Sequence, residues 1–321
     1  MALKSNTKKM TKLIPYSFLL IMLTTANIAH AWGPLGHRVV CDIAWRSSSA
    51  VIKKRLSSAA KRMAYRTFAE SCVWADHIKS QTQYDYLKPL HYMNLSKTAT
   101  TAASADCLSQ QSPQCVVSAI EHFSLQLGNT ALPQRDRDKA LLLVGHFVAD
   151  VHQPLHVSYR DDRGGTRRKV LFAGKSVSLH RLWDSELLYC RKLSGKKPSW
   201  RRLGSYLFTQ QGLHQHKDFY QQRDKPASSE EMSVVAWADE SFAITRQLYA
   251  SLKSKKLPAN YCAQYYPIAM QRLQLAGQRL AALLTVALVD CRTQAKSTAT
   301  AKNRCISPII SRHLKGTNFA K

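Results

Sequence analysis

The amino-acid sequence predicts a mainly α-helical protein with one folded domain. In most segments apolar residues recur at the three- and four-residue spacing of a helix, and only one short segment has the pattern of a strand. Hydrophobic residues make up 45% of the 321 residues, which is enough for a buried core. The chain contains no internal repeat, so a mainly α-helical fold in one domain is expected.

Several segments are predicted to be helices: residues 36–46, 51–69, 115–128, 136–150, 177–191, 229–253 and 264–289. In residues 136–150, Asp136 and Asp138 are placed in the first turn, where carboxylates interact favourably with the helix dipole. Residues 161–166 are predicted to form a glycine-containing turn, and residues 168–173 a short strand.

Residues 1–31 have the features of a signal peptide. Four lysines between Lys4 and Lys12 precede a short, interrupted apolar stretch, and Ala29-His30-Ala31 matches an A-x-A cleavage site. We expect export to the periplasm or the medium, with a mature chain that begins at Trp32; an uncleaved anchor is the alternative. No later segment is apolar enough for a bilayer span, so no stable membrane insertion is expected after the signal is removed.

The chain is strongly basic. Lysine and arginine outnumber aspartate and glutamate by 47 to 20, which gives a net charge of +27. Such a charge favours polyanionic partners, namely nucleic acid, anionic lipid or lipopolysaccharide, without choosing among them. Residues 291–321 contain no acidic residue and are predicted to form a basic, flexible tail after a folded domain over residues 32–290.

The cysteine content also indicates export. An even number of cysteines in an exported chain favours disulfides, and no C-x-x-C pair points to a zinc–thiolate or thioredoxin-type site. Spacing alone pairs none of the eight, which are Cys41, Cys72, Cys107, Cys115, Cys190, Cys262, Cys291 and Cys305.

The strongest chemical signal is the segment His146-Phe-Val-Ala-Asp150-Val-His152-Gln-Pro-Leu-His156. His146 and Asp150 are four residues apart, so a helix places both on one face, and Pro154 then ends that helix before His156. Imidazole and carboxylate groups are ordinary zinc ligands. A purely structural role would bury several polar groups in an apolar segment without evident partners, which is costly. The segment therefore indicates a metal site.

Further motifs accompany this segment along the chain. His180-Arg-Leu-Trp-Asp184 has the same His–Asp spacing, Trp74-Ala-Asp76 precedes Leu90-His91-Tyr92-Met93-Asn94, and Trp32-Gly-Pro-Leu-Gly-His37 directly follows the predicted cleavage site. In this order the motifs resemble those of the zinc-dependent single-strand nucleases of fungi, plants and bacteria (the S1/P1 type). That family shares its fold with bacterial zinc phospholipase C, so the resemblance implies a helical bundle of that type over residues 32–284.

The resemblance implies three zinc ions per chain. It assigns Asp76, His91, His146 and Asp150 to the first ion, His156, His180 and Asp184 to the second, and the amine and carbonyl of Trp32, His37 and a bridging Asp150 to the third. Trp32 provides a nitrogen ligand only as a free terminal amine, because a peptide nitrogen has no available lone pair. His152 matches a family histidine that is not a ligand, so a structural role is expected.

The implied catalytic residues are Asp76, Lys79 and Asp150. Asp76 would lie beside the nucleophile, and Lys79 stands where the fungal enzymes carry an arginine near the phosphate. A lysine there supplies a point charge in place of a bidentate guanidinium group.

The implied substrate-binding residues are Tyr92, Asn94 and Thr166. Tyr92 and Asn94 stand where fungal relatives place an aromatic residue and an aspartate around a nucleobase, and an aromatic ring stacks on any base. Thr166 replaces the asparagine of a Gly-Gly-Asn motif. The implied function is hydrolysis of single-stranded DNA and RNA to 5′-phosphorylated products, with 3′-nucleotides as further substrates.

The resemblance also implies a disulfide between Cys41 and Cys72, and it leaves the other six cysteines unassigned. Two alternative functions stay open. A zinc phospholipase C would carry glutamate where this chain has Asp184. A non-catalytic, zinc-containing nucleic-acid-binding protein would be expected to have a closed, cysteine-rich site, whereas the residues here are histidines and aspartates.

Overall fold

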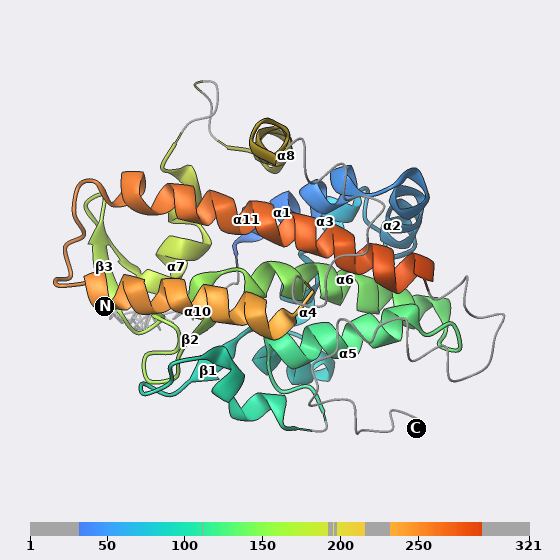
Figure 1. The fold of residues 1–321 in the computed structure, drawn as a ribbon, viewed down its shortest axis with the longest axis horizontal. Coiled ribbons are helices and arrows are strands. Elements are labelled where there is room, and N and C mark those ends of the chain that lie inside the picture. Colours follow the sequence, from blue (N-terminus) through green and yellow to red (C-terminus); the bar gives the residue numbers. More distant parts are fainter. Residues whose placement is uncertain (1–31, 111, 192–194, 196–197, 216–231, 291–321) are drawn as a thin grey trace, which may run out of the picture.

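The computed structural model describes residues 32–110, 112–191, 195, 198–215 and 232–290, and this part of the chain is mainly helical (Figure 1). The predicted leader and tail, with Cys291 and Cys305, lie outside the described residues. Within those residues, no helix has both the length and the apolar content that a membrane span requires.

The described residues contain α-helices, short 3-10 helices and four short strands. The α-helices are α1 (Pro34–Ser47), α2 (Ala50–Arg62), α3 (Phe68–Ser71), α4 (Trp74–Ile78), α5 (Val116–Gly128), α6 (Gln134–Val151), α7 (Leu179–Asp184), α8 (Trp200–Gln215), α10 (Val234–Ser251) and α11 (Tyr261–Thr285). The 3-10 helices are η1 (Thr82–His91), η2 (Ala102–Ser104), η3 (Asp106–Leu108), η4 (Pro154–His156) and η5 (Glu186–Tyr189), and a π-helical turn, η6 (Val286–Asp290), follows α11. The strands are β1 (Met93–Leu95), β2 (Val157–Tyr159), β3 (Lys169–Phe172) and β4 (Lys175–Ser178).

Helix α6 lies between α5 and α11, and α1 packs against α11, α8 and α3 (Figure 1). The contact between α1 and α11 is close because α11 presents Gly277 to α1, where a Cβ atom would lie 2.5 Å from Cγ2 of Ile43. The core formed by these helices includes Val40 and Ile43 of α1 and Val148 of α6, all fully buried. This packing holds α1 and α6, the helices that bear His37, His146 and Asp150, in a fixed relation.

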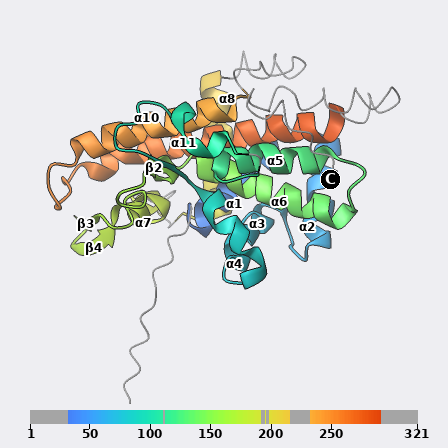
Figure 2. The same ribbon diagram turned by 90° about the horizontal axis from the view of Figure 1, so that it is seen from below.

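Two small sheets contribute to the region next to the C-terminal end of α6. β1 and β2 pair in parallel with Met93 opposite Val157, so His91 and His156, just before these strands, reach the same end of the sheet. β3 and β4 form an antiparallel hairpin in which Lys169 lies opposite Ser178. Figure 2 shows this hairpin and α7 together at one end of the molecule, with α2 at the other.

The structure confirms helices close to residues 36–46, 115–128 and 264–289, and a strand within 168–173. The predicted helix 51–69 is wrong in its second half. Helix α2 ends at Arg62, and Ala64 has a positive φ of 63°, which a continuing right-handed helix does not allow.

The predicted helix 177–191 is wrong at its start and in its continuity, because β4 uses Val177 and Ser178 to pair with β3 and the helical part is divided into α7 and η5. The chain is helical in α7 and turns again at Ser185, whose φ and ψ are −138° and −62°. Helix α8 was not predicted, since its sequence contains two glycines and a weak apolar pattern.

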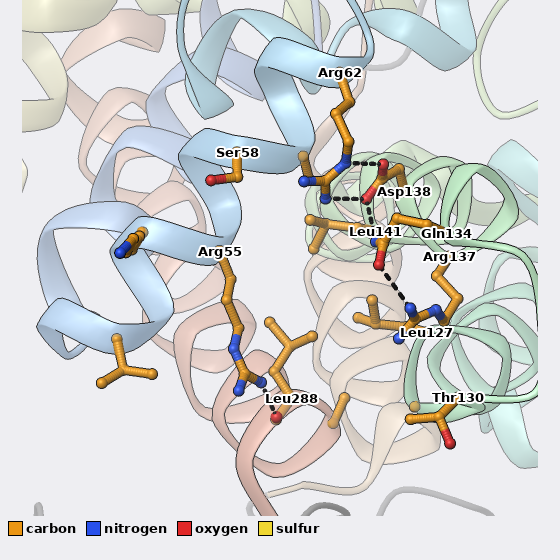
Figure 3. A pocket seen from close by; sticks show the side chains of 15 residues that line it. Arg55, Ser58, Arg62, Leu127, Thr130, Gln134, Arg137, Asp138, Leu141 and Leu288 are labelled. Atoms are coloured by element: carbon orange, nitrogen blue, oxygen red, sulfur yellow. Dashed lines mark hydrogen bonds and ion pairs between the residues drawn. The ribbon is translucent and has the colours of Figure 1, made fainter.

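The start of α6 corrects one further expectation. The helix begins at Gln134, so Asp136 lies in its first turn and Asp138 lies beyond it. Asp138 is buried and accepts hydrogen bonds from Nε and Nη2 of Arg62 at 2.6 and 2.7 Å, as Figure 3 shows. Its role is to pair with α2, and the helix dipole is not the reason for its position.

Candidate metal centre

The centre is built around the C-terminal half of α6. His146 and Asp150 are fully buried, and Nε2 of His146 lies 3.3 Å from Oδ2 of Asp150. The same oxygen lies 3.1 Å from Nδ1 of His91, at the end of η1. The other oxygen, Oδ1, lies 3.5 Å from Nε2 of His37 on α1. The two oxygens of Asp150 therefore face different histidines, as a carboxylate that bridges two cations would.

A disulfide holds the elements around this centre. Cys41 of α1 is bonded to Cys72, which precedes α4, so the bond links the helix of His37 to the segment of Asp76. This is the pairing that the resemblance implies. Gly145 of α6 lies against the bond, since a Cβ atom there would be 2.9 Å from Sγ of Cys72. A larger residue at this position would displace the helical turn that carries His146.

Three histidines are oriented by backbone carbonyl groups. Nδ1 of His146 lies 2.7 Å from the carbonyl oxygen of Cys72, Nδ1 of His156 lies 2.6 Å from that of His91, and Nδ1 of His180 lies 2.8 Å from that of Gly164. A carbonyl oxygen only accepts, so each Nδ1 carries the proton and each Nε2 keeps a lone pair. This is the usual arrangement of histidines that bind metals.

The ligand-type atoms gather in three buried groups, in each of which they lie within 4.8 Å of one another. The groups are His37, His146 and Asp150; Asp76, His91 and His146; and His156, His180 and Asp184. The last has the same side chains as the implied second zinc site. The other two contain the side chains implied for the first and third sites, with His146 between them and its ring stacked on that of His37 at 3.8 Å.

Burial determines the protonation of the centre. It raises the pKa of Asp150 and of Asp184 well above the ordinary aspartate value, and the charge of Asp76 adds to both shifts. Burial lowers the pKa of His37 and His156 well below the ordinary histidine value, and that of His180 to about 4. The histidines are therefore neutral near pH 7, as metal ligation requires, and a bound cation would favour the charged form of the aspartates.

The buried polar atoms fit a bound metal. Both ring nitrogens of His37, Oδ1 of Asp150 and Nε2 of His156 have no hydrogen-bond partner among the described residues. Leaving such atoms unsatisfied costs about 1–3 kcal/mol each, which coordination would recover. Neutral imidazole and carboxylate oxygen are the donor types that zinc binds.

The other predicted site residues lie beside these groups. Nζ of Lys79 is 2.8 Å from Oδ1 of Asp76, and both side chains are buried. Trp32 is fully buried, and the amide nitrogen of Gly33 donates to the carbonyl oxygen of Asp184 at 2.8 Å, so the predicted mature N-terminus lies near that ligand.

The implied substrate residues fall in two places. Tyr92 and Asn94 are exposed on either side of the buried Met93, so they share one face of the segment that begins at His91. Thr166 is half-buried at the end of the turn that contains Gly164, the hydrogen-bond partner of His180. Each place is thus adjacent in sequence to a predicted ligand or its partner.

Sequence reasoning missed residues that support the ligands. Nε2 of Gln153 donates to Oδ1 of Asp184 at 2.5 Å, and Oε1 of Gln153 accepts from the amide of Leu155. Gln153 is fully buried, and its position inside the His-rich motif is the sequence signal that could have identified it. His152 belongs to none of the three groups, and its ring lies between the carbonyl oxygen of Val148 and Nη1 of Arg279.

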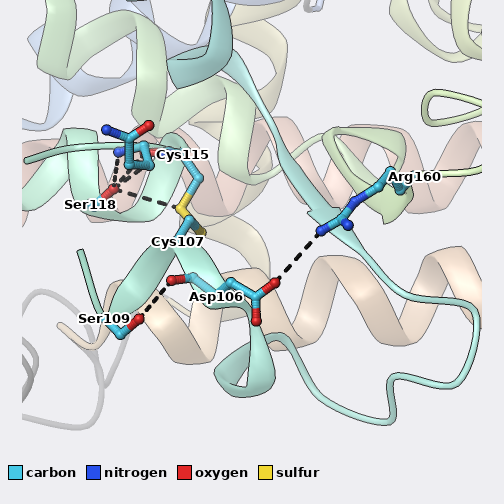
Figure 4. Close-up of a disulfide and its surroundings, with 7 residues drawn as sticks. Asp106, Cys107, Ser109, Cys115, Ser118 and Arg160 are labelled. Carbon is cyan, nitrogen blue, oxygen red and sulfur yellow. Dashed lines mark hydrogen bonds and ion pairs between the residues drawn. A yellow bond between two sulfur atoms is a disulfide. The ribbon is translucent and has the colours of Figure 1, made fainter.

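Two further disulfides join cysteines that the sequence left unassigned. Cys190 is bonded to Cys262 at the start of α11. Cys107 is bonded to Cys115, immediately before α5, and Figure 4 shows this bond beside Ser118 and the nearby ion pair of Asp106 and Arg160. The amide of Val116 donates to the carbonyl oxygen of Tyr92, so the Cys107–Cys115 bond closes a loop that is joined to the backbone of Tyr92.

Comparison with known proteins agrees with this geometry. The family model described as S1/P1 Nuclease matches residues 32–288. Endonuclease 1 of Arabidopsis thaliana is 28% identical over 87% of this chain and 94% of its own length. Endonuclease 2 of the same plant is 32% identical over 52% of this chain, and Nuclease S1 of Aspergillus oryzae is 27% identical over 56%. The matches cover 59% and 61% of the lengths of these last two relatives, respectively. The chain belongs to the S1/P1 nuclease family.

Proposed function

We propose that this chain is an exported, zinc-dependent nuclease that hydrolyses single-stranded DNA and RNA to 5′-phosphorylated products and also acts on 3′-nucleotides. Residues 1–31 would be removed on export, residues 32–290 would form the catalytic domain, and residues 291–321 would attract nucleic acid by charge. The observation that carries the proposal is the set of three buried His and Asp groups around α6.

We assign three zinc ions to these groups. Asp76, His91, His146 and Asp150 would hold the first ion and His156, His180 and Asp184 the second. His37, Asp150 and the amine and carbonyl of Trp32 would hold the third. Bound zinc supplies positive charge that stabilises a phosphoryl transition state and lowers the pKa of water to near neutrality.

The residues of the chain position the reaction around these ions. The two oxygens of Asp150 contact different histidines, His37 and His91. Asp150 thereby fixes the spacing between the group that contains His37 and the group that contains His91. The short contact of Lys79 with Asp76 holds an ammonium group beside the site, where it would attract the phosphate and orient that carboxylate. Tyr92 and Asn94 would contact a base, since they are exposed together next to His91.

The decisive experiment compares substrates side by side. Purified mature protein is incubated with single-stranded DNA, RNA, a 3′-nucleotide and phosphatidylcholine, with and without a chelator. We expect chelator-sensitive release of 5′-phosphorylated products from the nucleic acids and no release of headgroup from the lipid. Lipid hydrolysis would instead assign the centre to a phospholipase, and nucleic-acid binding without any hydrolysis would indicate a non-catalytic protein.

A further inference from the structure

A group of basic side chains surrounds the β3–β4 hairpin. Backbone hydrogen bonds bring the loop between α10 and α11 to this hairpin, from the amide of Leu171 to the carbonyl of Lys255 and from the amide of Leu257 to the carbonyl of Leu171. Figure 1 shows that loop beside β3. We call the combined surface the basic hairpin face; it consists of Arg163, Arg167, Arg168, Lys169, Lys175, Lys253, Lys255 and Lys256.

Carboxylates of the described residues leave the charge of the basic hairpin face unpaired. Within this part of the chain, none of its members lies within 4.0 Å of a carboxylate oxygen in an ion pair, and all except the half-buried Arg168 are exposed. The nearest carboxylates in sequence are Asp161, 3.8 Å from Lys97, and Asp162, which accepts from the hydroxyl of Tyr249 and the amide of Gly165. Neighbouring Arg160 differs, since it pairs with Asp106.

The basic hairpin face is continuous with the candidate metal centre. Strand β4 leads directly into α7, which carries His180 and Asp184. A strand of this length spans about 13 Å, so Lys175 lies a short distance along the chain from the first of these ligands. The turn that precedes β3 also holds His180 through the carbonyl oxygen of Gly164. A polymer with one phosphate at the centre therefore has further phosphates within reach of this surface.

We propose that the basic hairpin face binds the sugar–phosphate backbone of the nucleic-acid strand beyond the phosphate that is cleaved. This inference rests on the proposed function. Exposed lysines and arginines bind phosphates as charges and read no sequence, so the surface would increase the affinity for long strands of any sequence. A dinucleotide or a 3′-nucleotide would fill the metal centre without reaching the surface.

The test neutralises four lysines of the surface in one variant, Lys169→Gln, Lys175→Gln, Lys255→Gln and Lys256→Gln. A matched control neutralises four exposed cations of α2 and its neighbourhood at the other end of the molecule, Lys54→Gln, Lys61→Gln, Arg66→Gln and Arg135→Gln. For each protein, kcat/KM is measured as a function of salt on a single strand of about 30 nucleotides and on a dinucleotide. Both variants carry the same change in net charge, so only its position differs.

Each phosphate contact contributes about 0.7 to the logarithmic salt slope for a single strand, so four contacts contribute about 3. Between 50 and 200 mM salt, kcat/KM of the wild type on the long strand should therefore fall about 50-fold more than that of the hairpin variant. The control should keep the wild-type slope, and the loss should be confined to the long strand.

Two results would overturn the inference: equal salt slopes for the hairpin variant and the control, or an equal loss of the hairpin variant on the dinucleotide. Binding of the wild type to vesicles of anionic phospholipid, with unchanged slopes on DNA, would also overturn it and assign the face to a membrane surface. If the wild type cleaves neither substrate, the proposed function fails separately. Fluorescence anisotropy of the uncleaved strand then compares the same three proteins and decides the inference.

Discussion

The two ends of α6 each carry a buried carboxylate, and the surroundings of the two carboxylates differ. Near its start, Asp138 is 3% exposed and accepts hydrogen bonds from Arg62, at 2.6 and 2.7 Å, and from Gln134 at 2.9 Å. Near its end, Asp150 is fully buried among histidines, one of which, His37, has a pKa that burial lowers well below the ordinary histidine value, and its Oδ1 has no hydrogen-bond partner in the described part of the chain. The first carboxylate is paired with a cationic side chain of the protein, whereas the second has the surroundings expected of a metal ligand.

The difference shows which feature identifies a functional site here. A pocket lies at the start of α6, lined by Arg62, Gln134, Arg137 and Asp138 among others (Figure 3). Asp138 is the only acidic residue that lines it among those the structure describes, and Arg62 already binds this carboxylate. At the other end, three groups of metal-ligand atoms converge, and several of these atoms are buried without hydrogen-bond partners among the described residues. Buried ligand atoms without partners therefore indicate a metal site more directly than the pocket does.

The largest expected effect comes from exchanging each carboxylate for its amide. Asp150→Asn removes the charge between two groups, so hydrolysis should fall by roughly 1,000-fold or more, the equivalent of several kcal/mol of lost charge stabilisation. Zinc content should fall with it, while circular dichroism stays helical. The control, Asp138→Asn, should keep its zinc and its turnover. Near-normal turnover in Asp150→Asn, or loss of zinc in Asp138→Asn, would remove the distinction between the two ends.

This distinction was only half visible in the sequence. His146, Asp150 and His156 were found because helical spacing and a following proline put chemically matched residues on one surface. Asp138 was misread, because its partner Arg62 lies 76 residues away and local spacing contains no information about such a contact. Gln153 was overlooked for the related reason that its role depends on Asp184, 31 residues further along.

Helix limits were predictable where the apolar pattern was long and uninterrupted, as in α6 and α11. They failed where another interaction prevailed: Val177 and Ser178 pair with β3, although their sequence also fits a helix. Residues implied by the resemblance, such as Asp76 and His91, come from segments that the sequence analysis assigned to neither a helix nor a strand, although α4 and η1 form there. Only the tertiary fold brings them to α6.

The next effect concerns the side of Asp150 that faces His37. If a zinc ion there also binds the amine of Trp32, an N-terminally extended protein cannot form that bond, because a peptide nitrogen is a poor ligand. A mature chain with one extra alanine before Trp32 should therefore lose most of its activity and contain fewer zinc ions, with the ion at His37 lost first. Elemental analysis and activity are measured on folded, disulfide-intact protein. Full zinc content and activity in the extended form would show that Trp32 is not a zinc ligand. The assignment of the other two zinc sites would be unaffected.

A smaller effect is expected at two glutamines that donate hydrogen bonds to buried carboxylates. Nε2 of Gln153 donates to Oδ1 of Asp184, and Nε2 of Gln134 donates to Oδ1 of Asp138. Loss of a hydrogen bond to a metal ligand typically costs 10- to 100-fold in metal affinity or activity, so Gln153→Ala should release zinc roughly 10 times faster or more. Gln134→Ala should leave zinc release unchanged, because Asp138 keeps Arg62. Equal rates of zinc release in both variants would indicate that Gln153 has no positioning role.

The smallest effect is expected at the ion pair between Arg62 and Asp138, which involves no metal. The side chain of Arg62 is 46% exposed, so solvent screens its charge, yet Asp138 on the other side of the pair is buried. Arg62→Ala should lower the free energy of unfolding by about 1 kcal/mol, since Asp138 keeps Gln134 and gains partial access to water. The double variant Arg62→Ala, Asp138→Asn should recover part of this loss, because it removes the buried charge together with its partner. Urea unfolding with saturating zinc measures both values, and zinc content reports on the other end of α6. Loss of zinc from Arg62→Ala would show that the two ends of α6 are coupled through the helix. The ion pair at the start of α6 would then also support the metal centre at its end.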